Sequence, residues 1–123
     1  MKLLTLLFIL NATLLMLHEI ESSYEREWEI LKLSCKITGF LLLHIPILFL
    51  LFYGVLEIER QSQVGLILGL ITGIGGLIPF LVHKVLVVRK DKFNLLISNI
   101  LIGTNIVTGI LTIILSVRLI IHL

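Results

Sequence analysis

The sequence predicts an all-α membrane protein: a four-helix transmembrane bundle with a short charged interfacial segment after the first helix. Of the 123 residues, 58% are hydrophobic and 15% are charged, and the mean hydropathy is +1.13. A soluble domain of this size exposes much of its surface and cannot bury so large an apolar fraction. The apolar runs also lack the alternation of barrel strands, so we expect helices forming one domain over residues 1–123.

Four uncharged stretches predict the helices, because about 20 apolar residues cross a bilayer core of ~30 Å. The predicted helices cover residues 2–20, 35–56, 63–88 and 93–118. The first is short, since its uncharged run ends at Leu17, and Lys2 before an apolar run also resembles a signal peptide. No small-x-small cleavage site precedes the acidic residues that follow. We therefore expect this segment to be retained as a membrane helix.

The charged segment after the first helix contrasts with the apolar sequence around it. On a helix, four of its polar residues would share one face: His18, Glu21, Glu25 and Glu29. A solvated interfacial helix accounts for Glu25 and Glu29. The spacing of His18 and Glu21 also suits chelation of a divalent cation or a hydrogen-bonded acid–base pair.

The last two helices carry packing signals. Three glycines at four-residue spacing let another helix approach closely: Gly65, Gly69 and Gly73. This stripe predicts tight packing inside the bundle or a homo-oligomer, and Pro79 predicts a kink one turn before His83. In the fourth helix, an arc of roughly 100° predicts an inward hydrogen-bonding face of Asn94, Thr104, Asn105, Thr108 and Thr112.

The basic residues predict the orientation in the lipid bilayer. One side holds the first and third connections, with Arg26, Lys32, Lys36, Lys84, Arg89, Lys90 and Lys92. The other side holds only Lys2, Arg60 and Arg118. We therefore expect a multi-pass protein of a bacterial plasma membrane with both termini outside the cytoplasm. A net charge of +2 gives no indication of nucleic-acid binding, and the single Cys35 excludes a disulfide within one chain.

Three histidines are expected to converge at the cytoplasmic side. His18 ends the first helix there, His44 lies about 10 Å into the second, and His83 ends the uncharged run of the third. Polar groups at membrane depth are costly and usually face partners or a functional site. The sequence thus predicts a metal-binding or proton-handling site, with zinc as one suitable divalent metal, from His18, Glu21, Glu27, His44 and His83. In a hydrolytic site, Glu19 or Glu27 would be the general base.

A second interpretation requires no metal. The histidines could instead hydrogen-bond to Asn94, Asn105 or the glutamates and fix how the helices pack. The chain would then be a non-enzymatic packing or interaction protein. No His-Glu-x-x-His, Gly-x-Ser-x-Gly, Walker or dinucleotide-binding motif identifies a reaction, so the sequence leaves open whether the protein is an enzyme.

Short motifs are spread over most of the chain: His18-Glu19-Ile20-Glu21, Glu27-Trp28, His44-Ile45-Pro46, and His83 before the segment Leu95 to Gly103. Together they resemble a family of small bacterial integral membrane proteins of unknown function, similar in style to the HXXEE group. The resemblance implies a helical bundle with histidines and acids near one membrane face, and no established activity. Ser22 stands where the second acid of the HXXEE motif would be, so only His18 and Glu21 match it.

Overall fold

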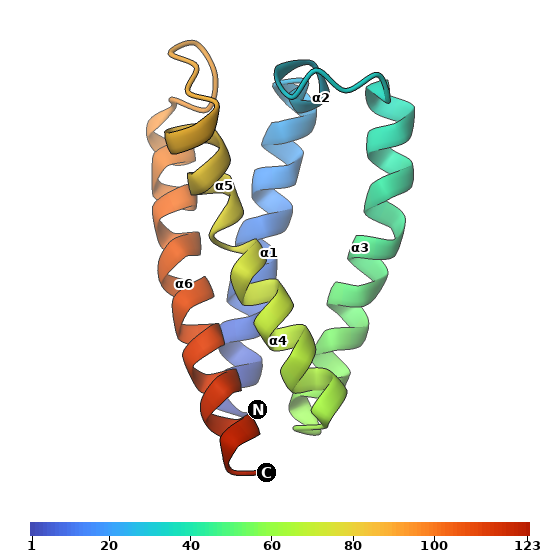
Figure 1. Cartoon of the computed structure of the whole chain (residues 1–123), viewed down its shortest axis with the longest axis vertical. Coiled ribbons are helices and arrows are strands. Elements are labelled where there is room, and N and C mark those ends of the chain that lie inside the picture. The colour runs from blue at the N-terminus through green and yellow to red at the C-terminus, as the bar shows by residue number, and fades with distance from the viewer.

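The computed structural model describes residues 1–123 as a bundle of helices without strands (Figure 1). Its elements are α1 (Leu3–Tyr24), α2 (Glu27–Ile30), α3 (Lys36–Glu59), α4 (Gln63–Gly75), α5 (Ile78–Phe80), the π-helical turn η1 (Leu81–Leu86) and α6 (Leu96–Ile121). Four helical segments are long and apolar enough to cross a membrane: α1, α3, the run from α4 through η1, and α6. The predicted all-α class with four apolar spans is confirmed.

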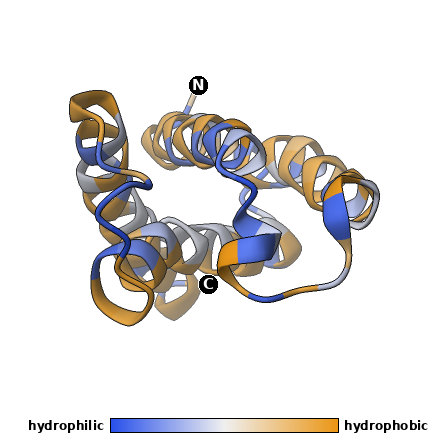
Figure 2. Cartoon of the chain, turned by 90° about the horizontal axis from the view of Figure 1, so that it is seen from above, coloured by the Kyte–Doolittle hydropathy of each residue, from blue (hydrophilic) through white to orange (hydrophobic).

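The chain runs up and down the bundle, so both termini lie at the same end as the turn between α3 and α4 (Figure 1). The opposite end carries α2 and the connection formed by residues 87–95. Seen from that end, the connection of residues 87–95 includes a hydrophilic stretch, and the connection through α2 alternates hydrophilic and hydrophobic residues (Figure 2). We call it the basic end, because it holds the first and third connections and their Lys and Arg residues.

Asn11 is the centre of the polar packing between helices. It is fully buried in the middle of α1, and its Nδ2 donates to the backbone oxygen of Thr72 in α4 at 2.7 Å. Its Oδ1 accepts from Asn105 Nδ2 at 2.7 Å and from Thr108 Oγ1 at 2.9 Å, both in α6. Since lipid offers no replacement hydrogen bonds, this one amide links three of the four long segments.

The inward face predicted for the fourth helix is only partly correct. Its buried members are Asn105, Thr108 and Thr112. Thr104 is exposed and donates to a carbonyl of its own helix, that of Ile100. Asn94 lies before α6, which begins at Leu96. Its side chain donates to the backbone oxygens of Arg89 and Lys90 in the preceding loop.

The glycine stripe packs inside the chain. Gly73 lies against the backbone of Gly109, and Gly69 lies against the side chain of Ser116, both in α6. Gly65 lies against the backbone of α3. All three stripe glycines are buried, so tight packing within the bundle accounts for the stripe, and the homo-oligomer stays a prediction.

Most helix ends differ from the prediction by up to about three residues, and two differences are larger. α1 continues to Tyr24 rather than to residue 20, which brings the acidic residues after His18 onto the helix. The third segment is broken rather than kinked: α4 ends at Gly75, Pro79 lies in the short α5, and η1 follows with His83 in it. Pro79 has no N–H to donate to a preceding turn, and π-helical turns are frequent at functional sites.

Replacing Asn11 with Ala should lower the free energy of unfolding in detergent by about 1–2 kcal/mol, because the polar groups of α4 and α6 lose their partner. Thermal unfolding of the purified protein measures this loss. Thr13→Val is the matched control, since Thr13 is exposed on the same helix and donates only to the Ile9 carbonyl. Equal losses for both variants would contradict the role assigned to Asn11.

Gly73→Ala should destabilise the protein by about 1–3 kcal/mol, the usual cost of overpacking. The added methyl group would meet the Gly109 carbonyl and the Ile113 side chain. Gly103→Ala is the control, because no atom lies near a methyl group there and alanine favours the helix by up to ~1 kcal/mol. Unfolding that is unchanged by Gly73→Ala would show that α4 and α6 are not in close contact.

Candidate metal centre

Three of the predicted site residues meet at the basic end of the bundle. They are His18 from α1, Glu27 from the start of α2 and His83 from η1, and one ligand atom from each lies within 4.8 Å of the other two. Two imidazole nitrogens and a carboxylate oxygen therefore come together from three separate segments. We call these three residues the His/Glu cluster.

A sharp turn between α1 and α2 brings Glu27 to the cluster. Arg26 adopts a left-handed backbone conformation with φ of 54°, which is uncommon for a residue other than glycine. The chain then reverses and α2 begins beside the end of α1. The buried ring of Trp28 packs on Phe40 of α3 at a centroid distance of 5.5 Å, which anchors this short helix.

Both imidazoles of the cluster are buried and have a nitrogen without a satisfactory partner. His18 is 3% exposed and His83 is 4% exposed. His83 Nε2 lies 2.9 Å from Glu27 Oε1, but the oxygen is off the direction of the ring N–H, so no aligned hydrogen bond forms. His18 Nε2 contacts Ser22 Oγ at 3.3 Å, whereas His18 Nδ1 has no partner. Unpaired buried polar atoms are rare, and His18 Nδ1 beside the imidazole and carboxylate of His83 and Glu27 points to a ligand.

Phe93 forms one wall of the cluster. Its ring stacks on His83 at a centroid distance of 3.8 Å and lies 5.4 Å from the His18 ring. Lys84 Nζ donates to the Phe93 carbonyl at 2.8 Å and so fastens the loop that carries this ring. The stacking limits how the imidazoles can turn and shields them on that side.

Glu27 supplies the negative charge of the cluster. Burial alone would raise the pKa of its carboxyl group, but its contacts with His83 and Ser22 and the positive charge that His83 and His18 can carry outweigh that effect. The pKa of Glu27 therefore lies below its ordinary value, and the group is ionised at neutral pH. A carboxylate between two imidazoles favours a bound cation.

The other two predicted ligands, Glu21 and His44, lie outside the cluster. Glu21 turns toward α6 and accepts a hydrogen bond from the hydroxyl of Ser98. His44 Nε2 lies 2.8 Å from Glu19 Oε2, and its Nδ1 donates to the Phe40 carbonyl at 2.6 Å. Since α3 stands away from the other helices at this end (Figure 1), His44 reaches Glu19 rather than the cluster.

The contact between Glu19 and His44 contains one shared proton. The Phe40 carbonyl can only accept, so Nδ1 of His44 carries a hydrogen. The short contact between Nε2 and the Glu19 carboxyl then needs one more proton, on either the ring or the acid. We call these two residues the Glu19–His44 pair; it can give or accept a proton.

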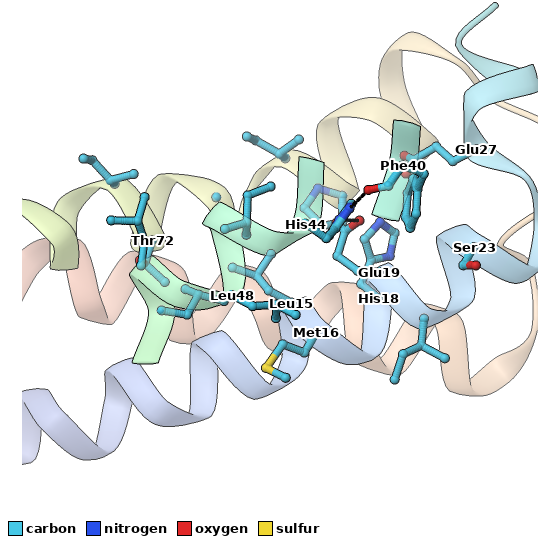
Figure 3. Close-up of a pocket in the computed structure, with 18 of the residues that line it drawn as sticks. Leu15, Met16, His18, Glu19, Ser23, Glu27, Phe40, His44, Leu48 and Thr72 are labelled. Atoms are coloured by element: carbon cyan, nitrogen blue, oxygen red, sulfur yellow. Dashed lines mark hydrogen bonds and ion pairs between the residues drawn. The ribbon is translucent and has the colours of Figure 1, made fainter. Parts of the chain in front are cut away.

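A cavity of about 710 Å³ adjoins both groups of residues. His18, Glu19, Glu27 and His44 line one end of it, as Figure 3 shows, and apolar side chains line the remainder. His83 does not line this cavity. The His/Glu cluster is therefore open on the side where His18 and Glu27 line the cavity. On its other side, the Phe93 ring covers it.

The family of the chain can be stated from its sequence. Residues 4–119 match the model of DUF6713, a family of unknown function. The chain belongs to the DUF6713 family. The DUF6713 match includes all residues of the His/Glu cluster and of the Glu19–His44 pair, so both lie within the family region. Neither the curated proteins nor the solved structures that were searched gave a match. Membership in DUF6713 brings no activity with it, and the resemblance to the HXXEE group stays a prediction.

Proposed function

We propose that this DUF6713 protein is an integral membrane protein that binds a divalent metal ion at His18, Glu27 and His83. The supporting observation is the approach of three ligand atoms within 4.8 Å in a buried site where His18 Nδ1 has no partner and His83 Nε2 faces the Glu27 carboxylate at 2.9 Å. Two histidines and one glutamate form a ligand set that zinc uses. Three protein ligands leave a fourth position for water, which is typical of catalytic rather than structural zinc sites.

The residues around the proposed metal site also support a hydrolytic role. Zinc makes its bound water acidic enough to supply a nucleophile near neutral pH. The Glu19–His44 pair lines the same cavity as His18 and Glu27, and it can accept a proton from a water molecule there. Glu19 was one of the two residues that the sequence suggested as a general base.

Elemental analysis of the detergent-purified full chain tests metal binding. We expect about one zinc ion per chain, and we expect His18→Ala, Glu27→Ala and His83→Ala each to lose it. His122→Ala should keep the metal, because His122 is exposed at the far end of α6. His44→Ala should also keep it, since His44 contacts Glu19 instead.

Two outcomes would contradict the metal site. One is a wild-type protein without metal after reconstitution with zinc. The other is an equal metal content in wild type and in a folded His83→Gln variant, which preserves size and hydrogen-bonding capacity without the imidazole. Size-exclusion chromatography and thermal unfolding establish that each variant is folded.

The structural interpretation of the histidines remains the second candidate function. It is favoured by the stacking of His83 on Phe93 and by the packing of the two imidazole rings at 5.1 Å. If packing were the only role of the two histidines, the wild type and His83→Gln would both contain no metal. The substitution would then reduce only the thermal stability. Metal content together with thermal stability thus separates the two functions.

We further propose that the basic end faces the cytoplasm of a bacterial plasma membrane, with both termini on the opposite side. The excess of Lys and Arg in the two connections at that end supports this orientation. A reporter fused after Leu123 should be active only in its non-cytoplasmic form, and a reporter inserted after Lys90 only in its cytoplasmic form. The reverse pattern would overturn the orientation and leave the metal site untouched.

A further inference from the structure

The cavity beside the His/Glu cluster lies between α1, α3 and α4 and reaches the segment from α5 to η1. Its volume of about 710 Å³ falls within the range of small-molecule sites, roughly 300–1,000 Å³. Figure 1 shows that α3 diverges from the other helices toward the basic end, where this cavity lies. The cavity is therefore a consequence of how the helices pack.

Most of the cavity wall is apolar and lies within the membrane-spanning segments. Leu15 of α1, Leu48 and Leu51 of α3, and Leu68 and Ile71 of α4 belong to this part of the wall. From His44 to Leu51 it follows α3 for about 10 Å by helical rise. Such a wall at this depth suits an extended hydrocarbon chain, because the surrounding medium consists of acyl chains.

The polar end of the cavity has a definite chemistry. Glu19 and Glu27 place two carboxyl groups there, and no Lys or Arg lines the cavity. Without a metal ion in the cluster, a phosphate or free carboxylate would therefore face acidic groups with no basic side chain to balance it. The Glu19–His44 pair can both donate and accept hydrogen bonds, which suits an uncharged group carrying hydroxyls and a carbonyl.

We propose that this cavity binds the single acyl chain of a membrane amphiphile with an uncharged, hydroxyl- and ester-bearing head group at the Glu19–His44 pair. A monoacylglycerol has this chemistry. The chain lies along the apolar wall, and the head group lies between Glu19, His44 and the side of the cluster formed by His18 and Glu27. This binding site goes beyond the metal site: its apolar wall and the Glu19–His44 pair include none of the three proposed metal ligands, and His18 and Glu27 lie beside the head group.

A photoactivatable monoacylglycerol, added to the detergent-solubilised full chain, tests the proposal. We expect saturable labelling of the wild type that unlabelled monoacylglycerol displaces. Leu48→Trp should reduce the apparent affinity roughly tenfold, because the larger ring displaces several methylene groups from the apolar wall. Leu42→Trp, on an exposed face of the same helix and outside the cavity wall, should bind as the wild type does.

The head-group assignment is tested by competition at equal chain length. In the His83→Ala protein, which is expected to lack the metal, a fatty acid and a lysophosphatidic acid, both anionic, should compete at least about tenfold more weakly than monoacylglycerol. Glu19→Gln removes one carboxylate from the polar end of the cavity. It should therefore reduce the difference in affinity between monoacylglycerol and the anionic lipids. Equal competition by all three lipids in the His83→Ala protein would overturn the assignment of an uncharged head group.

The cavity assignment has its own contradictory outcomes. Equal loss or equal retention of binding in Leu48→Trp and Leu42→Trp would show that the probe binds the outer surface as ordinary lipid. Mapping the labelled peptides gives a measurement on the wild type that does not depend on folding of any variant. Labelling confined to peptides other than those of α1, α3 and α4 that line the cavity would overturn the proposal.

His83→Ala separates this proposal from the metal site. It should lose the metal and still bind the monoacylglycerol probe, because its side chain contacts the cluster and not the cavity. Loss of labelling in a folded His83→Ala protein would contradict a lipid site independent of the metal. Metal binding without any lipid labelling in the wild type would overturn the lipid site alone.

Discussion

The hydrogen bonds of Asn11 are the interaction on which the rest of the bundle depends. Apolar side chains alone give helices little reason to associate in lipid, whereas small residues and interhelical hydrogen bonds do. Asn11 joins α1 to α4 and α6, and the glycines of α4 and α6 let these helices approach until backbone meets backbone. Only a small part of α3 is buried, and its hydrogen bonds to α1 lie toward its ends, where Glu59 accepts from Lys2 and Thr5 and where His44 contacts Glu19. α3 packs near the termini, where Phe8, Ile58 and Leu66 form a small apolar core.

This uneven packing explains why a cavity and a cluster of polar residues occur together. The three cluster residues come from α1, α2 and η1, so the parts of the chain that hold them belong to the tightly packed side or to its connections. α3 contributes no residue to the cluster and forms one wall of the cavity through His44 and Leu48. The site therefore combines fixed ligand atoms with an open apolar space that faces the same end.

The sequence was sufficient for the fold class and for part of the site. Uncharged runs separated by charges predicted four spans, and helical rise placed His18 and His83 at one end, which the structure confirms. It did not identify Asn11, because its partners lie 61 and 94 positions away and only tertiary packing reveals them. The separation of His44 from the cluster also depends on tertiary packing, since helical rise gives a depth in the membrane but not a distance between helices.

The π-helical turn has a consequence for how the site can change. Each backbone hydrogen bond of a π-helix spans one more residue than in an α-helix. The turn η1, which contains His83, therefore holds one residue more than an α-helical turn would. Removing a single residue from that turn would restore ordinary winding and rotate the imidazole by about 100°. The outer ends of the bundle would keep their contacts. Whether the His83 imidazole lies in the His/Glu cluster is thus decided by the phase of one helical turn.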